Sequence, residues 1–104
     1  MSMNNLERAA AVQQISVLAQ ALYDALESQN SEQILAAQQN LSTAAEALWA
    51  NVKSRTDITP REKGVLRLLA GDAIKELPEK IKDPANYPKI QRDLRLLKSS
   101  LVLV

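Results

Sequence analysis

At 104 residues and a formal net charge of +1, the chain is the size of a single domain and nearly neutral. It contains no His and no Cys, and its only aromatic residues are one Trp and two Tyr. Without imidazole or thiol groups, the sequence excludes Ser-His-Asp and Cys-His catalysis, zinc sites built on His and Cys, disulfides and a phosphorelay histidine. We therefore expect a non-enzymatic protein with no cofactor and no metal, whose useful surface is a helix face.

Charge is distributed unevenly along the chain. Residues 1–59 contain six acidic and three basic residues, whereas residues 60–104 contain ten basic and six acidic residues. An asymmetry of this kind can guide a charged partner. The N-terminus lacks a secretory signal, no apolar run approaches the roughly 20 residues of a membrane span, and the absence of Cys is typical of a reducing compartment. The sequence predicts a cytoplasmic, bacterial protein without a transmembrane segment.

The first half of the chain has the apolar period of two long helices. Over residues 5–29 a main apolar stripe and a second, weaker stripe predict a wide buried arc, and residues 31–55 carry a nearly heptad seam. Ser31 is the expected N-cap of the second helix, and the short link predicts an antiparallel hairpin. The main stripe is Ala11, Ile15, Leu18, Leu22 and Ala25 or Leu26; the second is Leu6, Ala10, Val17 and Ala21; the seam is Ile34, Ala37, Leu41, Ala44, Leu48 and Val52.

Two further helices follow. Thr59 as N-cap and Pro60 at the first helical position predict a third helix, which runs to Leu77 before Pro78 ends or kinks it. Residues 83–88 are a turn-rich connection to a last helix. The apolar stripe of that helix is Ile90, Leu94, Leu97 and Leu101. The sequence thus predicts one all-α domain over residues 1–104: an antiparallel bundle of three to four helices with a long N-terminal hairpin, and with 83–104 as a mobile or partner-binding segment.

Four apolar residues are candidate contacts for a partner protein. Trp49 lies at the edge of its helix's seam, as a core-rim aromatic or as an anchor for a partner helix. Gly64 and Gly71 fall together opposite the apolar stripe of their helix, where they permit close approach of another helix, unless Gly64 lies in a loose first turn. The apolar C-terminal end either covers the bundle or leaves an exposed patch. The candidate partner-binding residues are Trp49, Leu68, Leu97 and Leu101.

The last helix is also basic. A helix of this kind can contact nucleic acid or an anionic membrane surface. However, Asp93 interrupts the basic residues, Tyr87 is the only aromatic nearby, and the overall charge is almost neutral. These features favour a helix packed on the core with a solvated polar face, so nucleic acid is the less favoured partner. The basic residues are Lys89, Arg92, Arg95 and Lys98.

A pattern of apolar spacing extends over approximately residues 6–77. It consists of Leu18-x3-Leu22-x3-Leu26, then Ser31-x2-Ile34-Leu35, then Leu41 and Leu48. In this spacing and in length, the chain resembles the small flagellar and type III export chaperones of the FliT and FlgN class. Members of that class are cytoplasmic, non-enzymatic helical proteins that bind a terminal helix of an export substrate and deliver it to the export gate. The resemblance implies a role in flagellum biogenesis and makes the C-terminal region the counterpart of their mobile regulatory helix; the Pro-rich residues 83–88 depart from the pattern.

Three functions follow from these observations. The leading one is a protein–protein interaction module, such as an export chaperone, that takes an amphipathic helix of its partner into a groove. The second is a self-assembling structural protein, with a homo-oligomeric interface made by the wide arc of the first helix and the apolar C-terminal end. The third is a small nucleic-acid-associated regulator that uses the basic residues of the last helix.

Overall fold

The structure is a computed structural model that describes residues 5–53, 55–70 and 75–101, without the side chains of residues 5 and 68–70. Within these ranges the chain is all-α and has no strand, as predicted. The elements are α1 (Asn5–Ser28), α2 (Ser31–Val52), α3 (Pro60–Ala70), α4 (Leu77–Lys80), the 3-10 helix η2 (Pro84–Asn86) and α5 (Tyr87–Leu101).

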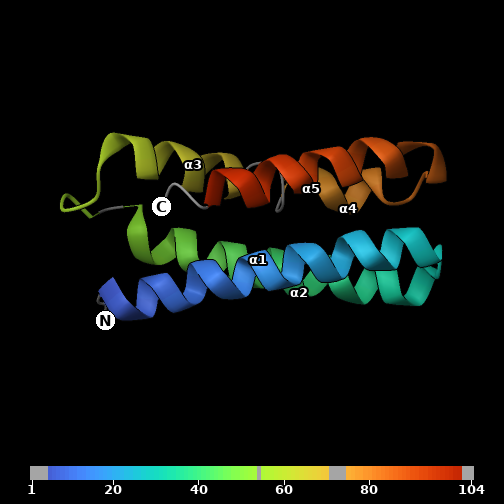
Figure 1. Ribbon diagram of the computed structural model, residues 1–104, viewed down its shortest axis with the longest axis horizontal. Helices are drawn as coiled ribbons and strands as arrows, with labels where there is room; N and C mark the ends of the chain where they lie inside the picture. Colours follow the sequence, from blue (N-terminus) through green and yellow to red (C-terminus); the bar gives the residue numbers. More distant parts are fainter. Residues whose placement is uncertain (1–4, 54, 71–74, 102–104) are drawn as a thin grey trace.

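The helices lie in two layers (Figure 1). Helices α1 and α2 form the predicted antiparallel hairpin, and α3, α4 and α5 form the second layer. Helix α5 packs antiparallel along α1, while α3 packs against α2 and also meets α5. The described chain therefore forms an elongated bundle of 40 × 22 × 20 Å, in which α1 and α3 each contact both α2 and α5.

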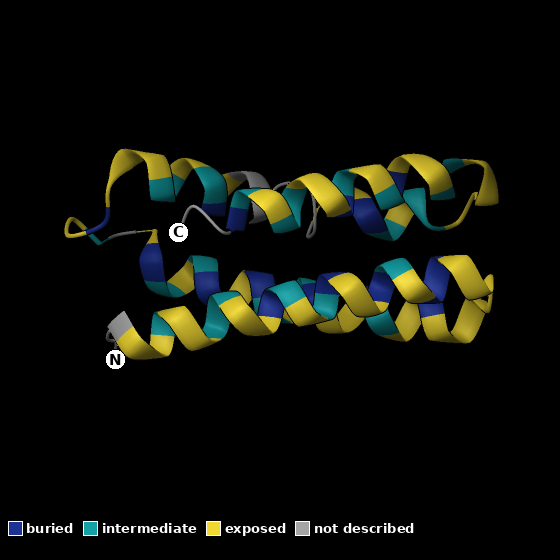
Figure 2. Cartoon of the chain, viewed as in Figure 1, coloured by how far each residue is buried: buried dark blue, intermediate teal, exposed yellow. Residues whose placement is uncertain are grey.

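The core lies between the two layers, and each long helix turns one line of buried side chains toward it (Figure 2). These lines follow the predicted main stripes, because positions three and four apart share one helix face. The only buried polar side chain among the described residues is that of Gln38, which donates a hydrogen bond to Ser42 Oγ at 2.7 Å. The buried apolar residues are Ile15, Ala19, Leu22, Ala25, Leu26, Ile34, Leu41, Ala45, Leu48, Val52, Ile58, Leu66, Leu77, Ile90, Leu94 and Leu101.

The predicted second stripe of α1 is not buried. Leu6 is 80% exposed and Val17 is 52% exposed, and Ala10 and Ala21 are exposed as well. The reason is the position of the neighbours of α1: both α2 and α5 pack on the side that carries the main stripe. The prediction of a wide buried arc for this helix was therefore wrong, and the second apolar stripe of α1 faces outward.

Local chemistry explains the helix starts. Asn30, and not Ser31 as expected, is the N-cap of α2: its backbone is extended and its Oδ1 accepts a hydrogen bond from the Gln33 N–H at 3.1 Å. Thr59 caps α3 as predicted, since its Oγ1 accepts from the Glu62 N–H at 3.2 Å. Helix α5 begins at Tyr87, because a proline at the next position needs no N–H partner in the first turn.

The third predicted helix is described in two parts, on either side of residues 71–74, which lie outside the described ranges. Helix α3 covers Pro60–Ala70, residues 75–76 are again helical, and the short helix α4 begins at Leu77 with Pro78 in its first turn. Gly71 lies outside the described residues. Gly64 is exposed, and a Cβ atom at this position would meet nothing within 4 Å beyond its own helix turn, so none of the other described helices approaches there.

Candidate partner-binding surface between α1 and α5

The structure does not bring the four predicted contact residues together. Trp49, on α2, and Leu97, on α5, are both half-buried against the core, on helices at opposite corners of the bundle. Leu101 is only 5% exposed and is part of the core itself. The side chain of Leu68 lies outside the described part of the chain. Two of the four residues therefore lie on α5, and both turn toward the bundle.

The outward side of α5 forms a polar edge with α1. One shallow groove between the two helices is lined by Gln20, Tyr23, Leu94, Arg95, Lys98 and Ser99. A second groove is lined by Tyr23, Pro88, Gln91, Arg92 and Arg95. Because the two grooves share Tyr23 and Arg95, they form one continuous strip, which we call the α1–α5 surface. Its lining includes the aromatic ring of Tyr23 and the polar side chains of Gln20, Gln91, Arg92, Arg95 and Lys98.

Tyr23 and Arg95 form the centre of the α1–α5 surface. The guanidinium carbon of Arg95 lies 5.2 Å from the centroid of the Tyr23 ring, and its Nη2 donates a hydrogen bond to the Tyr23 hydroxyl at 2.7 Å. A guanidinium at this distance from an aromatic ring is attracted by the negative face of the ring. The contact with Tyr23 holds the Arg95 side chain beside α1, and Arg95 remains exposed to solvent.

Two glutamines occupy the positions between the acidic side chains of α1 and the bases of α5. Gln20 Nε2 donates to Asp24 Oδ1 at 2.9 Å, and Gln20 Oε1 accepts from Lys98 Nζ at 2.5 Å. Gln91 Nε2 donates to Glu27 Oε1 at 3.0 Å and to the Tyr23 carbonyl at 3.4 Å. The carboxylates of Asp24 and Glu27 are thus bound by amide groups rather than by the bases of α5.

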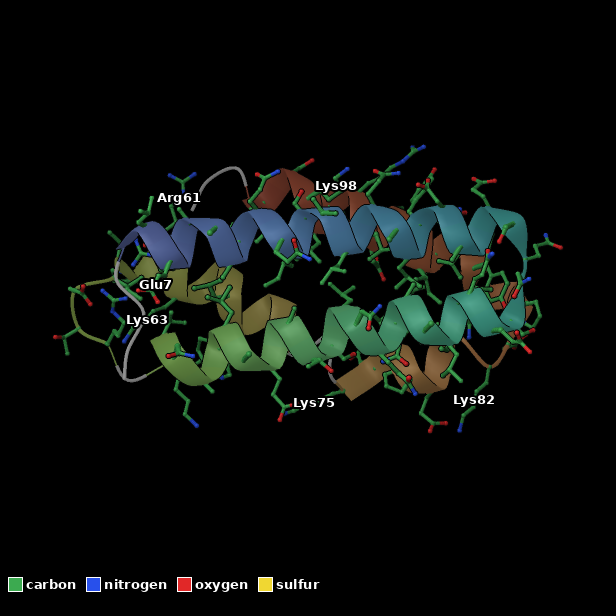
Figure 3. The ribbon with its side chains drawn as sticks, turned by 90° about the horizontal axis from the view of Figure 1, so that it is seen from below. Glu7, Arg61, Lys63, Lys75, Lys82 and Lys98 are labelled. Atoms are coloured by element: carbon green, nitrogen blue, oxygen red, sulfur yellow. The ribbon has the colours of Figure 1, made fainter. Side chains whose placement is uncertain are left out.

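Arg92, Arg95 and Lys98 consequently have no carboxylate partner among the described residues. Figure 3 shows Lys98 at the edge of the bundle where α5 lies beside α1, whereas Arg61 and Lys63 lie near the start of α3. Helix α5 also carries Leu96, which is 62% exposed and one helical turn beyond Arg92. The α1–α5 surface thus presents three bases and an aromatic ring, and Leu96 lies outside its lining, next to Arg92.

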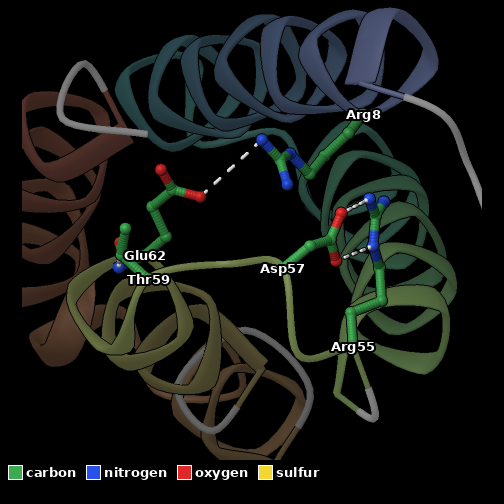
Figure 4. Close-up of polar contacts among 5 residues, drawn as sticks. All are labelled: Arg8, Arg55, Asp57, Thr59 and Glu62. Carbon is green, nitrogen blue, oxygen red and sulfur yellow. Dashed lines mark hydrogen bonds and ion pairs between the residues drawn. The ribbon is translucent and has the colours of Figure 1, made fainter.

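Other basic residues of the bundle form ion pairs instead. Lys80 Nζ lies 2.9 Å from Glu76 Oε2 and 4.0 Å from Asp93 Oδ2, which links α4 to α5. The hydrogen bond from Lys80, followed by its charge, lowers the pKa of the Glu76 carboxyl. Arg8 Nη2 lies 3.7 Å from Glu62 Oε2 and links α1 to α3 (Figure 4).

The α1–α5 surface offers hydrogen-bond donors, positive charge and apolar contact area, which are the means of non-covalent binding. Sequence reasoning singled out Arg92, Arg95 and Lys98, but it missed Tyr23 and Leu96. Two signals were present: Tyr23 is one of only three aromatic residues, and Leu96 lies outside the apolar stripe of its helix. The contact between Tyr23 and Arg95 was not predictable, because the two residues are 72 positions apart in the sequence.

Within the described ranges, no three or more Asp or Glu side chains lie together in a way that could hold a metal ion. None of the helices in these ranges is both long and apolar enough to cross a lipid bilayer. No protein-family model, no curated protein and no solved structure matches this chain.

Proposed function

We propose that this protein is a non-enzymatic interaction module that binds a helical segment of a partner protein at the α1–α5 surface. The observation that carries the proposal is the gathering of Tyr23, Arg92, Arg95 and Lys98 along the two grooves between α1 and α5. Tyr and Arg are enriched in protein interfaces and supply much of the binding energy there. A groove between two helices is suited to an amphipathic helix, which lays one face into it.

An export chaperone is the specific form of this proposal that the spacing pattern in the α1–α2 hairpin supports. In that form, the partner segment is a terminal helix of an export substrate, and the protein acts in a bacterial cytoplasm during flagellum biogenesis. Leu22, Leu26 and Leu48 of the pattern are core residues. The contacts with a substrate helix are therefore expected from outward side chains, which the α1–α5 surface supplies.

Photo-crosslinking in native cells tests the proposed function. A photoreactive amino acid placed at position 96 is expected to capture one or a few discrete proteins, since Leu96 lies one helical turn from Arg92, at the outer margin of the proposed interface. The matched control position is Thr43, which is exposed on α2, in the other layer of the bundle. No protein adduct at position 96, or the same adducts at position 43, would reject binding at this surface.

Charge-reversal variants add a second test of the same surface. The double variant Arg92→Glu/Arg95→Glu is expected to lose the adducts formed at position 96. The matched control Arg61→Glu/Lys63→Glu makes the same change of net charge near the start of α3 and is expected to retain them. Circular dichroism of both variants separates loss of binding from loss of fold.

Self-assembly is the second candidate function, and the outward apolar stripe of α1 favours it. Leu6 and Val17 are both more than half exposed, and a second copy could cover them. Light scattering at protein concentrations up to about 0.1 mM tests this candidate. A constant monomer mass over that range rejects it, whereas a concentration-dependent mass that Val17→Asp abolishes supports it.

A further inference from the structure

We infer that the α1–α5 surface takes a partner helix with one acidic edge, which faces α5, and one neutral or basic edge, which faces α1. This inference rests on the proposed function and names the chemistry of the partner segment. The α5 side of the surface is basic, because Arg92, Arg95 and Lys98 lie along it. The α1 side is acidic, because Asp24 and Glu27 lie beside it.

The spacing of the three bases matches a helix. Arg92, Arg95 and Lys98 follow one another at intervals of three residues, so their Cα atoms rise along α5 by about 4.5 Å per step and about 9 Å in total. Acidic residues three or four positions apart on a partner helix have nearly the same rise. A helix that lies along α5 can therefore bring one carboxylate to each base.

The present acceptors of two of these bases are neutral. Arg95 donates to the hydroxyl of Tyr23, and Lys98 donates to the amide oxygen of Gln20. Both present bonds already have an ionised donor, and a carboxylate acceptor adds the attraction between opposite charges. A carboxylate from a partner is therefore a better acceptor than the groups that now position these bases. Arg92 is exposed, and its guanidinium can bind a further carboxylate of the partner.

The acidic side of the surface selects against uniformly anionic partners. A nucleic acid backbone or an anionic lipid surface would bring negative charge to Asp24 and Glu27 as well as to the bases of α5. An amphipathic helix can present acidic residues along one edge only. Charge complementarity therefore favours a helix with two different edges over a polyanion.

Apolar contacts complete the expected partner. The half-buried Tyr23 ring lies in the groove between the basic and the acidic side, and Leu96, which is 62% exposed, lies at the outer margin next to Arg92. The face of the partner helix between its two edges is expected to be apolar, with anchors three or four residues apart. The partner segment is thus amphipathic and acidic on one edge.

Binding of designed helical peptides to the full-length chain tests the inference. The probe is an 18-residue helical peptide, a length of roughly 27 Å, with glutamates along one edge, lysines along the other and leucines between them. Two controls are used: one peptide in which glutamate replaces every lysine, so that both edges are acidic, and one in which glutamine replaces every glutamate. Binding is measured by fluorescence anisotropy of labelled peptide, in parallel with a single-stranded oligonucleotide and with vesicles of phosphatidylserine.

The acid-edge peptide is expected to bind at least about tenfold more tightly than either control peptide. Arg92→Glu is expected to reduce this affinity at least about tenfold, whereas Arg61→Glu leaves it within about twofold. Raising the salt concentration from 50 to 300 mM is expected to weaken binding, because part of the attraction is between exposed charges.

Equal affinity for the acid-edge peptide and either control peptide, or no binding of the acid-edge peptide at about 1 mM, would overturn the inference. Tighter binding of the oligonucleotide or the vesicles, with loss in Arg92→Glu, would overturn it in favour of a polyanion. If photo-crosslinking at position 96 still captures protein partners, the proposed function stands and only the acidic chemistry fails. If crosslinking fails as well, both fail.

Discussion

Gln29 is held in a conformation that suits glycine better than any other residue. It follows the last residue of α1, its φ is 57°, and its N–H donates to the Ala25 carbonyl at 3.1 Å. This left-handed residue ends many helices and is usually Gly, because other residues suffer a clash of Cβ with the backbone. The turn between α1 and α2 therefore stores a local strain that one substitution can remove.

Gln29→Gly is expected to raise the free energy of unfolding by about 0.5–1 kcal/mol. Relief of the left-handed conformation contributes about 1–2 kcal/mol, and the greater freedom of glycine in the unfolded chain offsets part of it. Urea unfolding followed by circular dichroism measures the change. Gln29→Ala is the matched control and is expected to give no gain, because alanine meets the same clash. A gain of the same size in both variants would contradict this explanation.

Asp57, in the connection between α2 and α3, makes the stability of the fold depend on pH. The hydrogen bond from Arg55, more than any other cause, lowers the pKa of the Asp57 carboxyl, and the charge of Arg8 acts in the same direction (Figure 4). A carboxyl whose pKa is lower in the folded state stabilises the fold above its unfolded pKa of about 3.9. That stabilisation is lost as the pH falls through the folded pKa.

Asp57→Asn is therefore expected to lower stability at pH 7 and to have a smaller effect at pH 3. The physical reason is that below the unfolded pKa the unfolded carboxyl takes up a proton more readily than the folded one, so the advantage of the ionised form decreases as the pH falls. Urea unfolding of wild type and variant at pH 7, 5 and 3 measures the difference. A difference that is independent of pH would show that the ionised carboxylate is not responsible.

At the scale of helices, α3 contains the one glycine that the structure describes. Gly64 lies inside α3, and a Cβ atom there would meet no atom within 4 Å. Glycine in a helix interior is less favourable than alanine by about 1 kcal/mol, because it loses more backbone freedom. Neither a turn nor a close approach within the chain explains its presence. Close approach of a partner helix remains the function that the sequence suggested for it.

Gly64→Ala is expected to raise the free energy of unfolding by about 0.5–1 kcal/mol. Thermal unfolding followed by circular dichroism at 222 nm reports the change. The variant also tests the earlier suggestion about partner docking: it retains crosslinking at position 96 if α3 is not part of the interface. A decrease in stability would contradict the open surroundings of Gly64.

The starts of two helices could be predicted from the sequence almost to the residue. The starts of α2 and α3 follow local rules, since Asn30 and Thr59 each cap backbone N–H groups within three residues. The prediction of Ser31 as the cap was wrong by one position, because both residues have suitable oxygen acceptors.

At the scale of the whole molecule, burial separates the two apolar stripes of α1. The main stripe, with Ile15 and Leu22, is fully buried, while Leu6 and Val17 of the second stripe are exposed. Core packing between the hairpin and the second layer should therefore depend on the first stripe and on the α2 seam that it meets. The second stripe should contribute little to the stability of one copy.

Leu22→Ala and Leu41→Ala are each expected to lower the free energy of unfolding by about 2–5 kcal/mol, because both side chains are fully buried and their loss leaves a cavity. Leu6→Ala and Val17→Ala are expected to change it by less than about 0.5 kcal/mol, as surface substitutions usually do. Urea unfolding at a concentration where the protein is monomeric measures all four. A large loss on truncating Val17 would instead place the second stripe in an interface.

The sequence by itself determined the all-α class, the α1–α2 hairpin and most of the core, because helix faces follow from residue spacing along one segment. The tertiary structure alone decided which stripe of α1 is buried and that Tyr23 lies under Arg95. Those outcomes depend on where α5 packs, and the contacts between α1 and α5 join residues 64 to 78 positions apart. Local periodicity carries no information over such separations, so the candidate surface emerged only when the two helices were brought together.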